Sequence, residues 1–188
     1  MKADFIIANP PFNDSDWSGA LLKDDARWKY GIPPGGNANY AWIQHFIYHM
    51  SPAKGMAGFV LAKGSLTSKT NNEGAIRKAI IEAGLLDCIV NLPAKLFLNT
   101  QIPACLWFLS RRKEGRLDKV LFIDTRNLGY LINRRTKDFT DEDIAKIAGT
   151  YHAWCHPSPS GRREGDEGIS YEDIPGFCKA VALDEIRQ

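Results

Sequence analysis

One stretch near the start of the chain limits what the rest can fold into. Residues 5–8 form an uninterrupted apolar run, Phe-Ile-Ile-Ala, and Asn9, Pro10 and Pro11 follow at once. A short apolar run closed by a turn signal is typical of a strand buried on both faces of a parallel sheet. Proline lacks an N–H, has a fixed φ and pushes the preceding residue toward extended backbone. The pattern predicts an α/β fold with a stiff turn at the carboxyl end of a strand, where ligands of open sheets bind.

This turn offers hydrogen-bond acceptors and few donors. The side chain of Asn9 and the carbonyl of Pro10 can both accept. The matching ligand is an amino group, such as the exocyclic amine of adenine or cytosine, whose lone pair is delocalised into the ring. Two acceptors that take its hydrogens favour a pyramidal nitrogen and free the lone pair to attack an electrophilic methyl group. Phe12 adds a flat apolar face suited to a base that has left its helix.

The motif Asn9-Pro10-Pro11-Phe12 behind an apolar strand resembles the catalytic motif of the amino-group methyltransferases that use S-adenosylmethionine. The resemblance narrows to the modification subunits of type I restriction-modification systems, because further segments match in order along nearly the whole chain. These segments are Asn-Ala-Asn-Tyr-Ala-Trp at 37–42, Gly-Phe-Val-Leu at 58–61, Asn-Thr-Gln-Ile-Pro-Ala-Cys-Leu-Trp-Phe-Leu at 99–109 and Tyr-Glu-Asp-Ile-Pro-Gly-Phe-Cys-Lys at 171–179.

The resemblance implies transfer of a methyl group from S-adenosylmethionine to the N6 amine of adenine in DNA. It implies that Asn9 and the Pro10 carbonyl orient the amine, that Phe12 stacks on the flipped base and that Pro11 holds the turn. It also places Asn9 beside the cofactor. The partners it implies are DNA, a specificity subunit that reads the DNA sequence, and a restriction subunit.

The chain also departs from the family pattern. Members of the family carry a glycine-rich cofactor loop, in an Asp-Pro-x-Cys-Gly-Ser-Gly context, upstream of this strand, and they continue past the segment that ends here at 183–188. We therefore expect an internal piece of a methyltransferase subunit that is inactive by itself. Residues 5–8 then leave an apolar strand edge that must be covered. We expect this edge to pair with a second copy or with an upstream segment.

Two alternatives stay open at this point. Motifs of the Asn-Pro-Pro-aromatic type also serve amino methyltransferases that act on RNA bases or on a protein glutamine. In the other alternative the chain is a catalytically silent scaffold or remnant, which the absent glycine-rich loop favours.

The composition limits which other classes of protein the chain can belong to. Lys and Arg total 24 against 22 for Asp and Glu, a net charge of +2, whereas a strong nucleic-acid footprint needs a basic stripe. No apolar run approaches the roughly 18 residues of a membrane span, and no signal peptide is visible. The four cysteines are widely spaced, as expected for reduced, buried thiols of a cytoplasmic protein.

The order of predicted elements sets the architecture. It corresponds to the C-terminal half of a doubly wound, Rossmann-like methyltransferase sheet with a terminal antiparallel strand pair and a helical C-terminal extension. The pair is antiparallel because the connection 93–103 is too short for a crossover helix. The expected strands are 5–8, 56–62, 85–92, 104–110 and 119–124, and the expected helices are 40–50, 75–83 and 140–154.

Three regions follow from this order. Residues 1–135 form a partial catalytic domain, 136–156 a C-terminal helix, and 157–188 a linker and tail with too little apolar periodicity to fold alone. Asn39 is a plausible N-cap of the first helix, and Thr140 opens a capping box on the last. The charged run 111–116 has the composition of a solvated hairpin tip.

Two polar loops follow strands and should flank the site. The aromatic residues of loop 13–37 either stack on bases or fold the loop onto the domain. The hydroxyl and lysine side chains of loop 63–74 could meet cofactor or phosphate, although solvent exposure is the expectation for each taken singly. The residues concerned are Trp17, Trp28 and Tyr30 in the first loop, and Ser65, Thr67, Ser68 and Lys69 in the second.

Two histidine pairs have the i, i+4 spacing of metal ligands. They are His45 with His49, and His152 with His156 near Cys155. No adjacent third ligand is visible for the first pair. We expect solvated or hydrogen-bonded histidines and no metal.

Overall fold

The computed structural model describes residues 1–97, 101–156 and 171–186. Its centre is a six-stranded sheet in the spatial order β1-β2-β4-β3-β5-β8, and a separate two-stranded ribbon pairs β6 with β7. The strands are β1 (Phe5–Ala8), β2 (Met56–Ala62), β3 (Leu86–Asn91), β4 (Ala104–Ser110), β5 (Lys119–Asp124), β6 (Tyr130–Leu131), β7 (Lys137–Asp138) and β8 (Cys178–Ala182). The helices are α1 (Asn39–His49), α2 (Glu73–Glu82), α3 (Asp141–Cys155) and α4 (Leu183–Ile186), with short 3-10 turns at Gly19–Leu22, Lys63–Leu66 and Thr70–Asn72.

Four strands of the sheet run in the same direction. β1 is parallel to β2, β3 is parallel to β5, and β4 lies antiparallel between β2 and β3. β8 is antiparallel to β5. The carboxyl ends of β1, β2, β3 and β5 therefore share one edge of the sheet, which we call the carboxyl edge.

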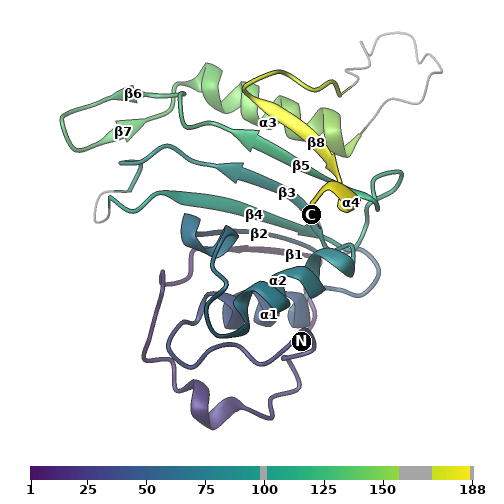
Figure 1. Cartoon of the computed structure of the whole chain (residues 1–188). Helices are drawn as coiled ribbons and strands as arrows, with labels where there is room; N and C mark the ends of the chain where they lie inside the picture. Colours follow the sequence, from purple (N-terminus) through teal and green to yellow (C-terminus); the bar gives the residue numbers. More distant parts are fainter. Residues whose placement is uncertain (98–100, 157–170, 187–188) are drawn as a thin grey trace.

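The helices cover the sheet in two layers (Figure 1). α1 and α2 pack on one face, where Ile43 and Ile80 join Phe59 and Trp107 in the larger apolar cluster. α3 packs on the other face and contributes Trp154 to a second cluster. This three-layer arrangement is the α/β fold that the sequence predicts, and the antiparallel pair of β3 and β4 is confirmed, with β5 and β8 extending the sheet beyond it.

One prediction about the first strand is wrong. β1 is not buried on both faces, because Phe5 and Ile7 are 75% and 94% exposed. Ile6 and Ala8 do pack against the core beneath α1. β1 is an edge strand, since β2 is the only described strand that pairs with it. The apolar cluster on the α3 face contains no residue of β1, so only the face toward α1 is covered. A continuous apolar run alone cannot distinguish an edge from a centre.

The charged segment 111–116 is not a solvated hairpin tip. β4 and β5 do not pair, because β3 lies between them, so the connection crosses the amino end of β3. Lys113 is 2% and Arg116 6% exposed. The Nζ of Lys113 donates to the carbonyl oxygens of Leu86 and Lys119 at 2.7 and 3.0 Å, and burial lowers the pKa of this amine.

The described part of the tail packs on the sheet. Residues 178–182 form β8 along β5. The sequence pattern does not predict this strand, because the strand is short and pairs with residues more than fifty positions away. The predicted linker at 157–168 lies outside the described residues. Thr140 forms the predicted capping box with Asp143 at the start of α3.

A buried ionic contact ties α3 to the sheet. The β3 ladder shifts register between Leu86 and Cys88, and Asp87 at this bulge is fully buried. Its carboxylate accepts from the Nη2 of Arg116 at 3.4 Å, from the hydroxyl of Tyr151 at 3.2 Å and from the Nε1 of Trp154 at 3.3 Å. Because both charged groups are desolvated, each depends on the other.

We predict that Asp87→Ala lowers the free energy of unfolding of this chain by about 3–5 kcal/mol, since it leaves the Arg116 guanidinium buried without its counter-charge. Urea denaturation measures the change. Glu114→Ala is the matched control, because the Arg112–Glu114 pair has side chains that are 65% and 76% exposed, and it should leave the urea midpoint unchanged. A loss of equal size in the two variants would contradict the prediction.

Candidate active site

The turn after β1 holds two acceptors without partners. Asn9 is exposed, Pro10 is buried, and neither the Asn9 side chain nor the Pro10 carbonyl takes part in a hydrogen bond within the described residues. Pro10 and Pro11 cannot donate to a ladder, so the strand ends where they begin. The structure therefore places two stiffly held acceptors just beyond the carboxyl edge.

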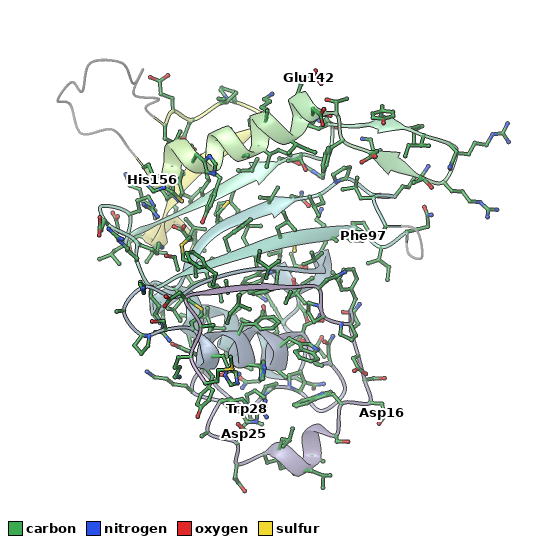
Figure 2. The ribbon with its side chains drawn as sticks, turned by 180° about the vertical axis from the view of Figure 1, so that it is seen from behind. Asp16, Asp25, Trp28, Phe97, Glu142 and His156 are labelled. Atoms are coloured by element: carbon green, nitrogen blue, oxygen red, sulfur yellow. The ribbon has the colours of Figure 1, made fainter. Side chains whose placement is uncertain are left out.

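Phe12 is half-buried beside the turn. Its ring meets the ring of Phe97 edge to face, with centroids 5.9 Å apart and an interplanar angle of 82°. Phe97 comes from the connection between β3 and β4 and stands at the carboxyl edge (Figure 2). The two rings belong to the apolar cluster that also contains Val60 and Leu106. Part of the Phe12 ring is therefore used for packing, and the rest is accessible.

Asn13 fixes the exit of the turn. It has a φ of +53°, a left-handed conformation that asparagine tolerates better than most residues. Its backbone N–H donates to the Oδ1 of Asn39 at 3.1 Å, and the Nδ2 of Asn39 donates to the Oδ1 of Asn13 at 2.9 Å. Asn39 is 2% exposed. Asn13 and Asn39 form a half-buried, reciprocal clamp between the turn and α1.

The sequence predicted Asn39 as the N-cap of α1, and this prediction is wrong. The N-cap is Ala38, and Asn39 is the first helical residue. Its backbone N–H donates instead to the Oδ1 of Asn37 at 2.9 Å. Sequence reasoning missed the clamp because an asparagine before a helix has an obvious local role, whereas the partner of this one lies 26 residues away.

The first turn of loop 63–74 is fixed at Ser65 by hydrogen bonds from α1 and from β4. The hydroxyl of Tyr40 donates to the Ser65 carbonyl at 2.6 Å, and the Nε1 of Trp107 donates to the Ser65 Oγ at 3.1 Å. Ser65 is 1% exposed, which corrects the expectation of solvent exposure. Ser68 donates to Glu73 within the loop. Thr67 and Lys69 are exposed, as expected.

The aromatic residues of loop 13–37 fold the loop onto itself. The Trp17 and Trp28 rings contact edge to face at 5.9 Å, and their N–H groups donate to the carbonyls of Pro34 and Leu22. Tyr30 packs against the core cluster beneath the sheet. Trp28 lies on the side of the molecule away from α3 (Figure 2). The structure thus favours packing over base stacking for these rings.

The histidines of α1 are engaged with neighbours. The Nη1 of Arg27 lies 2.8 Å from the Nδ1 of His45, and burial together with the nearby His49 lowers the pKa of His45. Arg27 also pairs with Asp25 at 2.7 Å. Among residues 1–97, 101–156 and 171–186, no group of three or more His, Cys, Asp or Glu side chains is arranged to hold a metal ion.

All four cysteines are free thiols. Cys88, Cys105 and Cys178 are buried and Cys155 is half-buried. Burial raises the pKa of Cys88, Cys105 and Cys155. None of the described helices combines the length and hydropathy that crossing a bilayer requires.

A hollow of about 560 Å³ opens elsewhere on the carboxyl edge. It is lined by the ends of β3 and β5 and by residues 173–179, with Asn91 and Asp124 at its polar rim. Arg126 donates to the Asp124 carboxylate at 2.9 Å and lowers its pKa. None of residues 9–12 lines this hollow, so it does not coincide with the acceptor turn.

The open edge of β1 lies next to the acceptor turn. Asn9 follows the carboxyl end of β1, and no other described strand covers the outer edge of β1. No glycine-rich loop follows a strand in the described ranges.

A mixed sheet with helices on both faces and a proline-stopped acceptor turn at its carboxyl edge defines an α/β domain of the class that binds ligands at this edge. The sequence model of the N-6 DNA Methylase family matches residues 1–188, and the chain belongs to this family. The family-level resemblance stated from the sequence is thereby confirmed.

Similar proteins support the assignment. The chain is 55% identical to the HindI methylase subunit of a type I restriction enzyme from Haemophilus influenzae, over 99% of this chain and 39% of that protein. It is 44% identical to the MjaIX methylase subunit from Methanocaldococcus jannaschii, over 99% of this chain and 33% of that protein. The chain therefore spans about two fifths or less of the length of these relatives.

A solved structure shares the fold. The type I restriction-modification methyltransferase subunit from Streptococcus thermophilus superposes with a TM-score of 0.81 at 29% identity. The match covers 99% of this chain and 35% of that subunit. The EcoKI M protein has the same fold with a TM-score of 0.66 at 19% identity.

We predict that Asn39→Ala lowers the free energy of unfolding by about 0.5–1.5 kcal/mol, because it removes both the acceptor of the Asn13 N–H and the donor to the Asn13 side chain. Urea denaturation of the chain measures the loss. Asn127→Ala, at an exposed asparagine with no described side-chain hydrogen bond, is the control and should change little. An unchanged midpoint for Asn39→Ala would show that the clamp does not hold the turn.

Proposed function

We propose that this chain carries the substrate-amine half of a DNA N6-adenine methyltransferase that works within a type I restriction-modification complex. The observation that carries the proposal is the pair of unengaged acceptors, the Asn9 amide oxygen and the Pro10 carbonyl, held at the carboxyl edge by two prolines and the Asn13–Asn39 clamp. The membership in the N-6 DNA Methylase family supports it.

The roles follow from hydrogen-bond chemistry. Asn9 and Pro10 accept the two hydrogens of the adenine N6 amine, which localises the nitrogen lone pair. Phe12 offers its accessible face to the flipped base, and Phe97 holds Phe12 by the edge-to-face contact. Pro11 keeps the turn rigid. The localised lone pair could then form the new N–C bond while the S–C bond of a sulfonium methyl donor breaks and its electron pair leaves with the thioether sulfur. The surplus proton leaves the nitrogen afterwards, so no general base of unusual pKa is required.

S-adenosylmethionine, the usual cofactor of the family, supplies a methyl group on a sulfonium centre when it is bound. In this proposal Asn9 borders it, and residues outside 1–188 provide the remaining contacts. A strand added to the open edge of β1, from another part of the full-length protein or from a second copy, would place such residues next to Asn9 and pair the free backbone groups of that edge. The partners are DNA, a specificity subunit and a restriction subunit.

In the full-length protein, Asn9→Ala should lower adenine N6 methylation by about 100-fold or more, the loss typical of removing one preorganised hydrogen-bonding group. Transfer of labelled methyl groups to unmodified DNA, followed by nucleoside mass spectrometry, measures it. Asn127→Ala is the matched control and should retain activity.

The same assay with RNA and with a glutamine-containing peptide tests the other amino-group substrates. Methylation of RNA or peptide in preference to DNA would contradict the proposal. So would an Asn9→Ala protein that modifies adenine at the normal rate.

The isolated chain of residues 1–188 should bind S-adenosylmethionine weakly or not at all, with a Kd above about 1 mM. The reason is that its described residues supply only one wall of the cofactor site. Isothermal titration calorimetry tests this, with the full-length protein as the positive control. Tight binding to the isolated chain would show that the cofactor site lies within these residues.

A further inference from the structure

A two-stranded ribbon projects from the carboxyl edge. It consists of β6, β7 and the turn between them, residues 130–138, and we call it the β6–β7 arm. It extends beyond the ends to which β3 and β5 point (Figure 1). Nothing in the hydrophobic pattern predicts it, because each strand has only two residues.

The arm is built as a rigid support. At its tip, the Oδ1 of Asn133 accepts from the backbone N–H groups of Arg135 and Thr136 at 2.8 and 2.9 Å, and Ile132 N–H donates to the Thr136 carbonyl at 3.0 Å. These bonds fix the backbone of the turn. Side chains presented from such a turn lose less conformational freedom on binding.

The base of the arm is anchored to two other elements. Lys95, in the β3–β4 connection, accepts from the backbone N–H of Lys137 at 2.9 Å and donates its Nζ to the Arg134 carbonyl at 3.0 Å. On the other side, Gly129 N–H donates to the Oδ2 of Asp143 in the capping box of α3, at 3.0 Å. The arm is thereby fixed relative to the sheet.

The charges of the arm are available to a ligand. Residues 125–139 contain four basic residues and one acidic residue. Arg134 and Arg135 are both exposed, and no ion pair involves either within the described residues. Arg126, by contrast, is neutralised by Asp124 at 2.5 Å. The free positive charge therefore gathers at the tip.

An apolar group accompanies these charges. Tyr130, Leu131 and Ile132 are 51%, 58% and 55% exposed. A basic pair next to exposed apolar side chains matches a sugar-phosphate backbone, in which phosphates alternate with the apolar faces of sugars.

The arm is also connected to the acceptor turn. Lys95, which binds the arm, lies two residues before Phe97, and Phe97 contacts Phe12. Phe97 stands at the same edge of the molecule as the arm (Figure 2). A duplex that delivers an adenine to the turn after β1 therefore runs along the edge from which the arm projects.

We propose that the β6–β7 arm binds the backbone of duplex DNA, with Arg134 and Arg135 on phosphates that flank the target adenine. This inference rests on the proposed function, because it takes DNA as the ligand of the carboxyl edge. Phosphate contacts fix the register of a protein on DNA without reading its sequence. The arm would thus hold the duplex while the base is extruded.

The test uses the full-length protein and a fluorescein-labelled duplex of arbitrary sequence, with Kd measured by anisotropy at several KCl concentrations. The double variant Arg134→Gln with Arg135→Gln should weaken binding by about tenfold and reduce the slope of log Kd against log salt by about 2, since each phosphate contact contributes roughly 0.9. Arg134→Lys with Arg135→Lys keeps both charges and should restore the slope.

The matched control is Lys78→Gln with Arg112→Gln. It removes two exposed charges of the same sign from α2 and from the β4–β5 connection, and it should leave both Kd and slope close to those of the unaltered protein. Equal effects of the two double variants would mean that the arm affects DNA binding only through the net charge of the protein. That result would overturn the proposal.

The remaining outcomes separate this inference from the proposed function. If the unaltered protein methylates adenine but the arm variant binds duplex with normal Kd and slope, the arm is not a DNA contact and the proposed function stands. If no adenine N6 product forms while the arm variant still loses DNA binding, the proposed function fails and the arm remains a DNA contact. Loss of association with a partner subunit at unchanged DNA affinity would identify a protein interface and overturn the proposal.

Discussion

The reciprocal hydrogen bonds between Asn13 and Asn39 are the contact on which the geometry of the candidate site depends. Two prolines can stop a strand, but they do not by themselves direct the chain that follows. The clamp does this by joining the turn to the first residue of α1, and it satisfies the N–H of a residue in a left-handed conformation. The position of Asn9 is thus set by β1 on one side and by α1 on the other.

α1 can serve as this support because it is fixed in turn. Tyr40 is fully buried and donates to Ser65, which also accepts from Trp107 of β4. This chain of contacts runs from the acceptor turn through α1 and the loop after β2 to the middle of the sheet. Burial raises the pKa of Tyr40 to about 12, so its hydroxyl remains a hydrogen-bond donor at any physiological pH. The site is therefore mounted on the core and not on a separate loop.

The β4–β5 connection lies at the opposite edge of the sheet, where β3 begins. The chain must pass from β4 to β5 around the amino end of β3, and it does so with charged residues. Lys113 caps carbonyls there, and Arg116 meets the carboxylate of Asp87, which also anchors α3 through Tyr151 and Trp154. α3 then positions the base of the β6–β7 arm through Asp143. Charges buried at one edge thus help to order the structure that projects from the other.

The sequence by itself determined the local elements and the chemistry of the turn. Five strands, three helices, the capping box of Thr140 and the acceptor character of Asn9 and Pro10 follow from periodicity, proline geometry and side-chain type, which act over a few residues. The antiparallel pairing of β3 and β4 also follows, because the eleven-residue connection 93–103 is too short for a crossover helix.

Only the tertiary structure decided the features that join distant residues. The exposed face of β1, the crossing of β3 by 111–118, the pairing of β8 and the Asn13–Asn39 clamp depend on which strands become neighbours. The same is true of the β6–β7 arm, whose anchors at Lys95 and Asp143 lie on either side of it in the sequence. Such contacts leave no periodic signal, because hydrogen bonds between residues far apart in the chain are fixed by the packing of the sheet and not by local preference.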